Sequence, residues 1–366
     1  MPTTGNEPIF SFIQQGAIIK EFVIAGRNIV LGFPDDQAYQ THNTAYFGET
    51  IGRVANRVRD ATIQNLNGRS CHLAANNGPN SAHGGSVGWG KKMFQGPNLE
   101  MRDGKETAVF RLRAEHGDEG YPGTVDFSVA YTASTEVEAG LEKALLIIDY
   151  EVKLADEQPE GIEETAINIT NHRHVLPQKK PPPSTKLTSR HCTSYFNIGP
   201  GETITGTKAT LRTDLHLPTD ENGIPIGNIE PCPGVKANEA FTLDEGESDF
   251  DDCFILNDHP ATVPLDTRPL PLRTAALFGH AETGMHLEVL TTEPAFQFYT
   301  GKYIDVPAVG GAPTRKAYAG FCVEPSRYIN AVNVDEWRNM TVLRLGEVYG
   351  SRIGYKAWKD SGNSNS

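Results

Sequence analysis

Short stretches in which apolar and polar residues alternate recur along the chain. They cover residues 9–13, 17–24, 28–33, 108–114, 124–132, 144–154, 286–292 and 340–345. In one of them Val125, Phe127, Val129 and Tyr131 share a face, which is typical of an antiparallel strand with one solvated side. No window of comparable length keeps the 3.6-residue period of a helix, and 36 Gly and 24 Pro punctuate the stretches. The pattern predicts an all-β protein, a large sandwich of antiparallel sheets.

The 366 residues are enough for one large domain or two modest ones, and 38% of them are hydrophobic. No change of composition marks a domain boundary, so we expect a single domain over residues 1–360 and a disordered tail over residues 361–366. The turn-rich stretches 217–235 and 259–273 are expected to form long surface loops.

One segment, residues 173–193, differs from the rest of the chain. It holds five Lys or Arg, no acidic residue and a run of three prolines, although the formal net charge of the chain is -13. A segment of this composition buries too little apolar surface to offset the entropy of ordering. We therefore expect an exposed, mobile excursion with some polyproline character.

Charge and cysteine content exclude several classes of function. The 46 acidic residues against 33 basic ones argue against a nucleic-acid or anionic-membrane surface, which needs a basic stripe. The five cysteines form no CxxC pair, which predicts neither a disulfide framework nor a zinc site. We therefore expect reduced thiols. The start shows no signal-peptide pattern and the sequence has no apolar run of membrane-spanning length, so the sequence indicates a cytoplasmic protein.

Four polar, glycine-containing segments are candidates for chemistry. In the first, Asn56 and Arg57 follow a turn at residues 52–53; the guanidinium suits sugar hydroxyls or carboxylates, and a surface ion pair is the alternative. The second, residues 77–85, is a glycine-rich loop that carries His83 and could equally be a plain turn.

In the third segment Asp251 and Asp252 lie between aromatic residues. Adjacent strand residues point to opposite faces, so at most one of the two enters a site; a solvated acidic turn is the alternative. In the fourth, Glu324 ends an apolar run before Pro325. Partial desolvation there would raise its pKa and suit a general base, whereas an exposed strand end is the alternative.

His172 closes the alternating stretch 166–170 together with Asn171, where side chains can face a cleft. His172 and His174 have the spacing of two metal ligands on one strand face. No third ligand stands near them in the sequence, so no metal is expected.

Taken together, these segments resemble the aldose 1-epimerases, or galactose mutarotases, over nearly the whole chain. The matching motifs, in order, are FGETIGRVANR at 47–57, NGPNSAHGG at 77–85, EGYPG at 119–123, TNH at 170–172, SYFN at 194–197, DDCF at 251–254, QFYTG at 297–301 and GFCVEP at 320–325. With TNH and SYFN counted as one, these seven motifs in one order are far more specific than any single motif.

The resemblance implies a large antiparallel β-sandwich and interconversion of the α and β anomers of a small hexose without a metal or organic cofactor. It implies that Glu324 is the general base and His172 the general acid, and that five residues hold the sugar: Asn56, Arg57, His83, Asp251 and Gln297. One group removes the C1 hydroxyl proton while the other protonates the ring oxygen, so the ring opens, the aldehyde rotates and the ring recloses. Neither the preference between glucose and galactose nor the oligomeric state follows from the sequence.

Two features depart from the family pattern. Ser326 stands where the family often has Gln, and 21 residues, 173–193, separate TNH from SYFN. We interpret this insertion as a retained short intron, with a genuine loop as the alternative. His191 could replace His172 as the acid; His172 is favoured because Thr170 and Asn171 precede it.

Two other functions stay open. A sugar-binding homologue without turnover would keep the pocket and lose the chemistry. A hexose-phosphate epimerase of similar fold would require more basic residues around the pocket than Arg57 alone.

Overall fold

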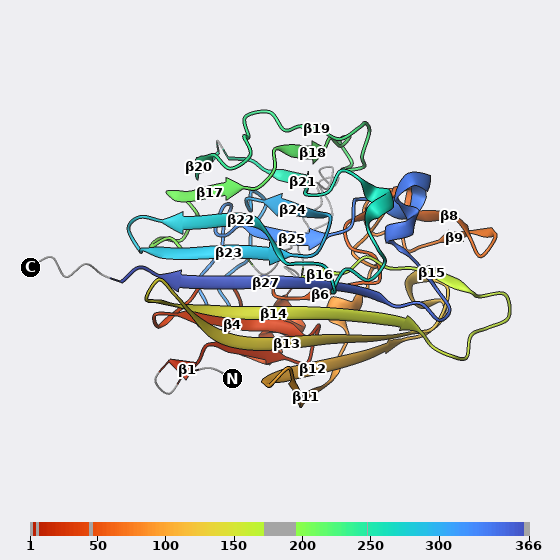
Figure 1. Cartoon of the computed structure of the whole chain (residues 1–366), viewed down its shortest axis with the longest axis horizontal. Coiled ribbons are helices and arrows are strands. Elements are labelled where there is room, and N and C mark those ends of the chain that lie inside the picture. The colour runs from red at the N-terminus through yellow and green to blue at the C-terminus, as the bar shows by residue number, and fades with distance from the viewer. Residues whose placement is uncertain (1–2, 5–6, 44–46, 172–194, 247, 362–366) are drawn as a thin grey trace, which may run out of the picture.

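The computed structural model describes residues 3–4, 7–43, 47–171, 195–246 and 248–361 (Figure 1). The proposed acid His172, the alternative His191, the insertion 173–193 and the tail residues 362–366 lie outside this part of the chain. Predictions that concern them stay predictions.

A large antiparallel sheet of nine strands dominates the molecule (Figure 1). Its strands, in order across the sheet, are β11 (Gln95–Arg102), β12 (Lys105–Ala114), β13 (Val125–Glu138), β14 (Leu141–Leu154), β27 (Tyr349–Lys359), β23 (Met285–Thr291), β22 (Arg273–His280), β17 (Thr207–Leu211) and β20 (Ala240–Leu243). The predicted alternation in β13 is confirmed, because Val125, Phe127, Val129 and Tyr131 are all buried.

A second antiparallel sheet of five strands, here called the small sheet, carries most of the candidate residues. Its strands, in order, are β19 (Glu230–Pro231), β18 (Leu215–Leu217), β21 (Asp251–Ile255), β24 (Ala295–Tyr299) and β25 (Cys322–Ser326). In Figure 1 it lies in the upper half, near β22 and β23.

Aromatic side chains join the two sheets face to face. Phe278 of β22 has its ring centroid 5.8 Å from that of Phe298 on β24 and stacks at 4.1 Å on Phe321, which directly precedes β25. These rings belong to one continuous apolar core to which both sheets contribute. Burial of this interface is the main stabilising contribution. The predicted all-β sandwich is therefore confirmed.

Shorter elements surround the sheets. One three-stranded sheet contains β3 (Phe10–Ile13), β4 (Ile18–Ile24) and β5 (Arg27–Asn28). The strand pairs are β1 (Thr3–Thr4) with β2 (Glu7–Pro8), β6 (Thr50–Ile51) with β16 (Thr170–Asn171), β7 (Arg57–Val58) with β10 (Ser81–Ala82), β8 (Thr62–Leu66) with β9 (Arg69–His72), and β15 (Glu164–Ala166) with β26 (Val342–Arg344).

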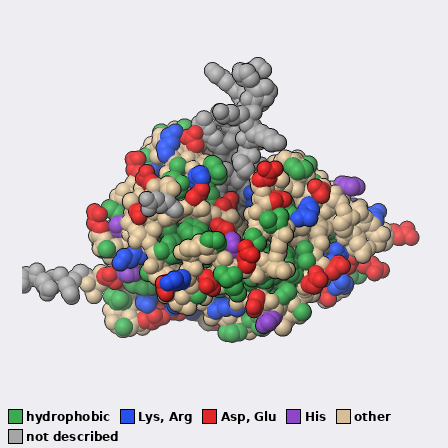
Figure 2. All heavy atoms as spheres, turned by 90° about the horizontal axis from the view of Figure 1, so that it is seen from above, with side chains coloured by type: hydrophobic (Ala, Val, Ile, Leu, Met, Phe, Trp, Pro, Cys, Tyr) green, Lys and Arg blue, Asp and Glu red, His purple; other side chains and the backbone are tan. Residues whose placement is uncertain are grey.

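The helical elements are few and short. They are α1 (Asp36–His42) and the 3₁₀ helices η1 (Arg59–Ala61), η2 (Trp89–Lys91), η3 (Asp118–Gly120), η4 (Pro260–Thr262), η5 (Ala331–Asn333) and η6 (Asp335–Met340). Within the described ranges, none of them has the length and hydropathy that crossing a bilayer requires. On the face shown in Figure 2, Lys and Arg side chains are interspersed with Asp and Glu.

Two predicted strands are shorter in the structure. Over residues 28–33 the backbone bonds to several partners in turn, with Ile29 N donating to Phe22 O and Leu31 N to Tyr195 O, so β5 ends at Asn28. The stretch 340–345 begins inside η6, and β26 starts at Val342.

The prediction of no helical stretch misses α1. This helix begins after Asp35, whose side chain accepts a hydrogen bond of 2.8 Å from Ala38 N. Its seven residues make two turns, too few to establish a period in the sequence.

Candidate active site

Three of the predicted residues come from neighbouring strands of the small sheet. Gln297 of β24 pairs across the sheet with Glu324 of β25 on one side and with Cys253 of β21 on the other. Directly opposed residues share a face of the sheet, as does Asp251, two positions before Cys253. Gln297 Nε2 donates a 2.9 Å hydrogen bond to Asp251 Oδ1. Strand pairing therefore gathers these residues from distant parts of the sequence.

Asn56, which directly precedes β7, and Arg57, the first residue of β7, reach the same cluster. Asn56 Nδ2 donates to Gln297 Oε1 at 3.1 Å, and Arg57 Nη1 donates to Asn56 Oδ1 at 3.2 Å. Arg57 Nε also donates to Asn77 Oδ1 at 3.3 Å. Asn56 adopts a left-handed backbone with φ of 57°, which Asn tolerates better than most residues. A continuous hydrogen-bonded chain thus runs from Arg57 to Asp251.

His83 is attached to this cluster through the backbone. Its N–H donates to Asn56 O at 3.0 Å, next to the pairing of Ala82 with Arg57 between β10 and β7. The following Gly84 is required, because a Cβ there would lie 1.9 Å from Gly52 O. The structure therefore brings together Glu324, Gln297, Asp251, Asn56, Arg57 and His83; the seventh predicted residue, His172, lies outside the described residues.

A pocket of about 250 Å³ opens beside the cluster. Arg57, Asp251 and Gln297 line it, whereas Glu324, Asn56 and His83 are buried and do not line it. The rest of the wall comes from one loop and four residues outside it: Thr219, Asp220, Glu221 and Gly223 of the loop, and Asp249, Asp252, Tyr303 and Ile329. A volume below the roughly 300–1,000 Å³ of drug-sized sites suits a single small molecule.

The loop closes onto Arg57 through backbone. A Cβ on Gly223 would lie 2.5 Å from Arg57 Cζ and would displace the guanidinium, and the backbone φ of 72° at this position also favours glycine. The turn is held by Asp220 Oδ1, which accepts from Asn222 N at 2.8 Å and from Ile224 N at 3.0 Å. Loop 217–235, expected from the sequence, thus includes a wall of the pocket.

Acidic side chains predominate around the opening. The pocket lining contains five carboxylates and one guanidinium: Asp220, Glu221, Asp249, Asp251, Asp252 and Arg57. Lys302 forms an ion pair with Asp249 at the rim. The potential of this lining favours neutral or cationic ligands over anionic ones.

Asp251 and Asp252 point to different partners, as adjacent strand residues do. Asp251 accepts from Gln297, whereas Asp252 Oδ1 accepts from His216 Nδ1 at 3.0 Å. Burial raises the pKa of Asp252, and the bond from His216 opposes this shift. Asp251 is the one joined to the candidate cluster. Both aspartates nevertheless line the pocket, so the expectation that at most one of them enters a site is wrong.

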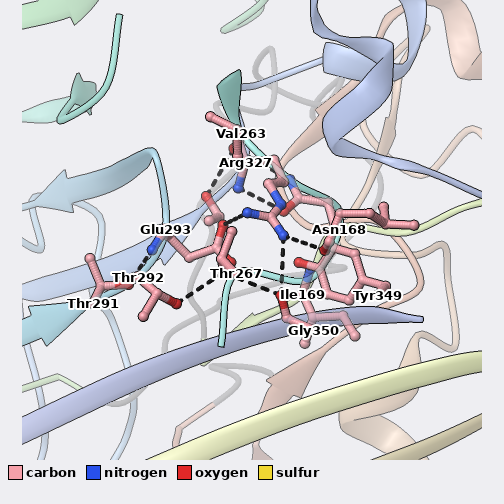
Figure 3. A network of polar contacts seen from close by, with 12 residues as sticks. Asn168, Ile169, Val263, Thr267, Thr291, Thr292, Glu293, Arg327, Tyr349 and Gly350 are labelled. Atoms are coloured by element: carbon pink, nitrogen blue, oxygen red, sulfur yellow. Dashed lines mark hydrogen bonds and ion pairs between the residues drawn. The ribbon is translucent and has the colours of Figure 1, made fainter. Parts of the chain in front are cut away.

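The backbone after Glu324 is anchored by a buried charge network that the sequence did not indicate (Figure 3). Arg327 Nη1 lies 3.1 Å from Glu293 Oε2, and neither side chain is exposed. Arg327 Nη2 donates to Leu265 O at 2.9 Å and to Gly350 O at 3.2 Å, and its guanidinium lies 4.9 Å from the centre of the Tyr349 ring. Burial raises the pKa of Glu293, which Arg327 counteracts.

Asn168 connects this network to the Asn56 segment. Its Oδ1 accepts from Arg327 N at 2.9 Å, while its backbone O accepts from Ala55 N at 2.7 Å and its N–H donates to Arg53 O at 3.0 Å. Asn168 therefore holds the residues that follow Glu324 through its side chain and those that precede Asn56 through its backbone. The only sequence signal for Asn168 is its polar position inside the alternating stretch 166–170.

The EGYPG motif supports the same segment from another side. Arg53 Nη1 donates to Pro122 O at 2.9 Å, to Gly123 O at 2.8 Å and to Thr165 Oγ1 at 3.2 Å. Burial lowers the pKa of Arg53 to about 10. This motif has a structural role, because it fixes the chain three residues before Asn56.

A buried carboxylate next to a row of amide and guanidinium donors can exchange a proton with a hydroxyl that those donors orient. Glu324 and the chain from Arg57 to Asp251 provide this combination.

Comparisons with known proteins agree with this arrangement. The sequence profile of the family described as aldose 1-epimerase matches residues 4–174 and 192–356, leaving out 175–191. The bifunctional protein GAL10 of Pachysolen tannophilus is 35% identical over 350 residues, covering 94% of this chain and 45% of the relative. The galactose mutarotase of Homo sapiens is 32% identical over 335 residues, covering 90% of this chain and 83% of the relative.

The chain thus spans less than half the length of the bifunctional relatives that it matches. Among solved structures, a GalM/aldose epimerase homologue from C. elegans superposes with a TM-score of 0.73 at 22% identity, covering 96% of both chains. Galactose 1-epimerase from Lactobacillus acidophilus gives a TM-score of 0.70 at 20% identity, covering 96% of this chain and 91% of the other. At these identities the two structures support the fold.

Proposed function

The chain belongs to the aldose 1-epimerase family, and from this premise we propose that it interconverts the α and β anomers of hexoses such as galactose and glucose. The observation that carries the proposal is the hydrogen-bonded chain from Arg57 through Asn56 and Gln297 to Asp251, on the same sheet face as Glu324.

In the proposed mechanism, Glu324 removes the proton of the C1 hydroxyl while His172 protonates the ring oxygen. The C1–O5 bond breaks, the aldehyde carbon rotates, and the ring closes on its other face with the two groups in exchanged roles. Each proton transfer contributes roughly 10²–10⁴-fold to the rate, and fixed positioning adds to it. The reaction requires neither a metal nor an organic cofactor.

The remaining residues are proposed to orient the sugar. Arg57 and Gln297 donate hydrogen bonds to hydroxyl oxygens, and Asp251 accepts from hydroxyl groups at the pocket wall. Asn56 holds Arg57 and Gln297 in place, and the buried His83 completes the polar surface beside Asn56. These side chains already bond to one another, which limits the reorganisation that binding requires.

The acidic lining disfavours the hexose-phosphate alternative, because a phosphate dianion would meet five carboxylates and one guanidinium. The presence of Glu324, the proposed base, beside the hydrogen-bonded cluster disfavours a sugar-binding homologue without turnover. We place the activity in the cytoplasm, since no disulfide joins the four cysteines in the described residues, Cys71, Cys232, Cys253 and Cys322.

We further propose that residues 173–193 are an insertion into one domain formed by residues 1–360, and do not take part in the chemistry. The family profile supports this, because it leaves out 175–191 and resumes before SYFN. Deleting 173–193 should give a protein at least as active as the full chain. A transcript that retains the segment, together with an inactive or unfolded deletion variant, would show that the segment belongs to the enzyme.

Polarimetry tests the proposed function directly. The full chain, added to freshly dissolved α-D-galactose or α-D-glucose, should accelerate the approach to equilibrium rotation in proportion to its concentration. Glucose 6-phosphate should be a much poorer substrate. No acceleration with either neutral sugar would contradict the proposal, and faster turnover of the phosphate would favour the hexose-phosphate alternative.

A further inference from the structure

A second cluster of ligand-type side chains lies at the edge of the small sheet. It combines His216 of β18, Cys232 just after β19 and Asp252 of β21. One nitrogen, one sulfur and one oxygen atom from these residues all lie within 4.8 Å of one another. Asp252 also lines the sugar pocket, but none of the three side chains is among the residues proposed to hold the sugar or transfer protons.

The scaffold around the cluster is regular. In β18 and its neighbours, His216 pairs with Glu230 on one side and with Phe254 on the other. Cys232 N donates a 2.6 Å hydrogen bond to Asp214 O. The three side chains are therefore fixed by paired backbone, and metal sites require this kind of preorganisation.

The histidine ring has one satisfied and one unsatisfied nitrogen. Nδ1 donates to Asp252 Oδ1 at 3.0 Å, whereas the buried Nε2 has no hydrogen-bond partner among the described residues. The His216 side chain is only 9% exposed, so leaving that nitrogen unpaired is costly. The two ring nitrogens point in different directions, so an ion shared with Asp252 would bind at Nδ1 in place of its proton, and Nε2 would carry the ring proton.

We propose that His216, Cys232 and Asp252 bind one Zn²⁺ ion. Imidazole, thiolate and carboxylate together suit zinc, whereas calcium and magnesium select oxygen ligands. Bonds of about 2.0–2.3 Å place tetrahedral ligand atoms roughly 3.4–3.7 Å apart. The His216 and Asp252 atoms at 3.0 Å are already close to this spacing, and the thiol must move by about 1 Å at most.

The ion would act on the loop that borders the sugar pocket. His216 and Cys232 stand at the two ends of the loop that contains Thr219 and Gly223, and Asp252 directly follows Asp251. Binding would join the ends of this loop to β21. Its expected consequence is a more stable protein and a loop more resistant to proteolysis.

The spacing explains why the sequence did not reveal this cluster. The three residues are at positions 216, 232 and 252, with no CxxC or HxxxH pattern. Only the pairing of β18 with β19 and β21 brings them together.

Calorimetric titration of the full chain, freed of metal by a chelator, with Zn²⁺ tests the proposal. One ion should bind per chain and raise the Tm by about 3 °C at a concentration about 100 times its Kd. Cd²⁺ as a probe should produce thiolate-to-metal charge-transfer absorption. Cys232→Ser should remove that absorption and weaken Zn²⁺ binding by more than about 100-fold. Asp252→Asn keeps the shape of the side chain and should weaken binding by about 10–100-fold.

Two cysteine variants are matched controls. Cys71 lies in a separate apolar cluster, and Cys192 lies in the insertion outside the described residues. Cys71→Ser and Cys192→Ser should both keep the Zn²⁺ affinity and the Cd²⁺ absorption. The proposal is overturned if the wild-type chain binds no Zn²⁺, if Cys232→Ser binds like wild type, or if Cys192→Ser abolishes binding.

Discussion

The buried ion pair between Arg327 and Glu293 allows a quantitative prediction, because both side chains are fully buried at 3.1 Å. Glu293→Gln removes the negative charge and leaves the guanidinium uncompensated inside the protein. Removing one partner of such a pair typically costs about 3–5 kcal/mol. Glutamine keeps an acceptor for Arg327, so we expect the lower end, about 3 kcal/mol.

That cost corresponds to a measurable shift of the melting temperature. With an unfolding entropy of about 2.1 cal/mol/K per residue, the 366 residues give roughly 0.8 kcal/mol/K, so Tm should fall by about 4 °C. Thermal unfolding followed by circular dichroism measures this shift. The same substitution at Glu239, in the exposed pair with Lys236, is the control and should hardly change Tm.

A double-mutant cycle identifies the cause of the shift. In the double variant Glu293→Gln with Arg327→Met, neither charge of the pair remains. Its destabilisation should therefore be clearly smaller than the sum of the two single effects. If the single effects add, or if Glu293→Gln melts within 1 °C of wild type (about 0.8 kcal/mol on the scale above), the reasoning about this pair is wrong.

Three further predictions concern the surroundings of the site. Asn168→Ala leaves the Arg327 N–H without its acceptor and should lower the free energy of unfolding by about 1–3 kcal/mol. It should also lower kcat more than it raises KM, because the side chain positions residues and does not bind sugar; an effect on KM alone would contradict this role. Burial raises the pKa of Glu49 from 4.5 to about 7, so the folded state holds this proton more tightly than the unfolded chain does. The wild-type protein therefore loses stability as the pH rises through that range. The Tm of Glu49→Gln relative to wild type should increase between pH 5 and pH 8, and a constant difference would refute the shift. Asp251→Asn should lower kcat/KM by about 10–100-fold, whereas Asp252→Asn should cost less than about tenfold; the reverse order would mean that Asp252 holds the sugar.

Local patterns in the sequence predicted the strands but not the arrangement of the site. The buried face of β13, with Val125, Phe127, Val129 and Tyr131, can be recognised in the sequence because apolar residues recur at every second position of a single strand. Asp251, Gln297 and Glu324 become neighbours only through the pairing of β21, β24 and β25. No short sequence pattern encodes that strand pairing, so only the resemblance to the family motifs grouped these residues.

The buried charged residues could not be predicted from the sequence. Arg327 and Glu293 have the composition of surface residues, and long-range packing alone makes them a core pair. The same holds for Asn168, whose bonds join residues 53, 55 and 327 across more than a hundred positions. In each case the partner is set by tertiary structure, which no spacing rule anticipates.

The most direct test of the proposed chemistry is the rate of anomer interconversion catalysed by Glu324→Gln, measured by polarimetry with α-D-galactose. The substitution keeps the size of the side chain and removes the proposed base, so kcat should fall by at least about 10²-fold while Tm changes little. Glu157→Gln, at an exposed glutamate, should match wild type. A Glu324→Gln enzyme with the wild-type rate would contradict the assignment of Glu324 as the base.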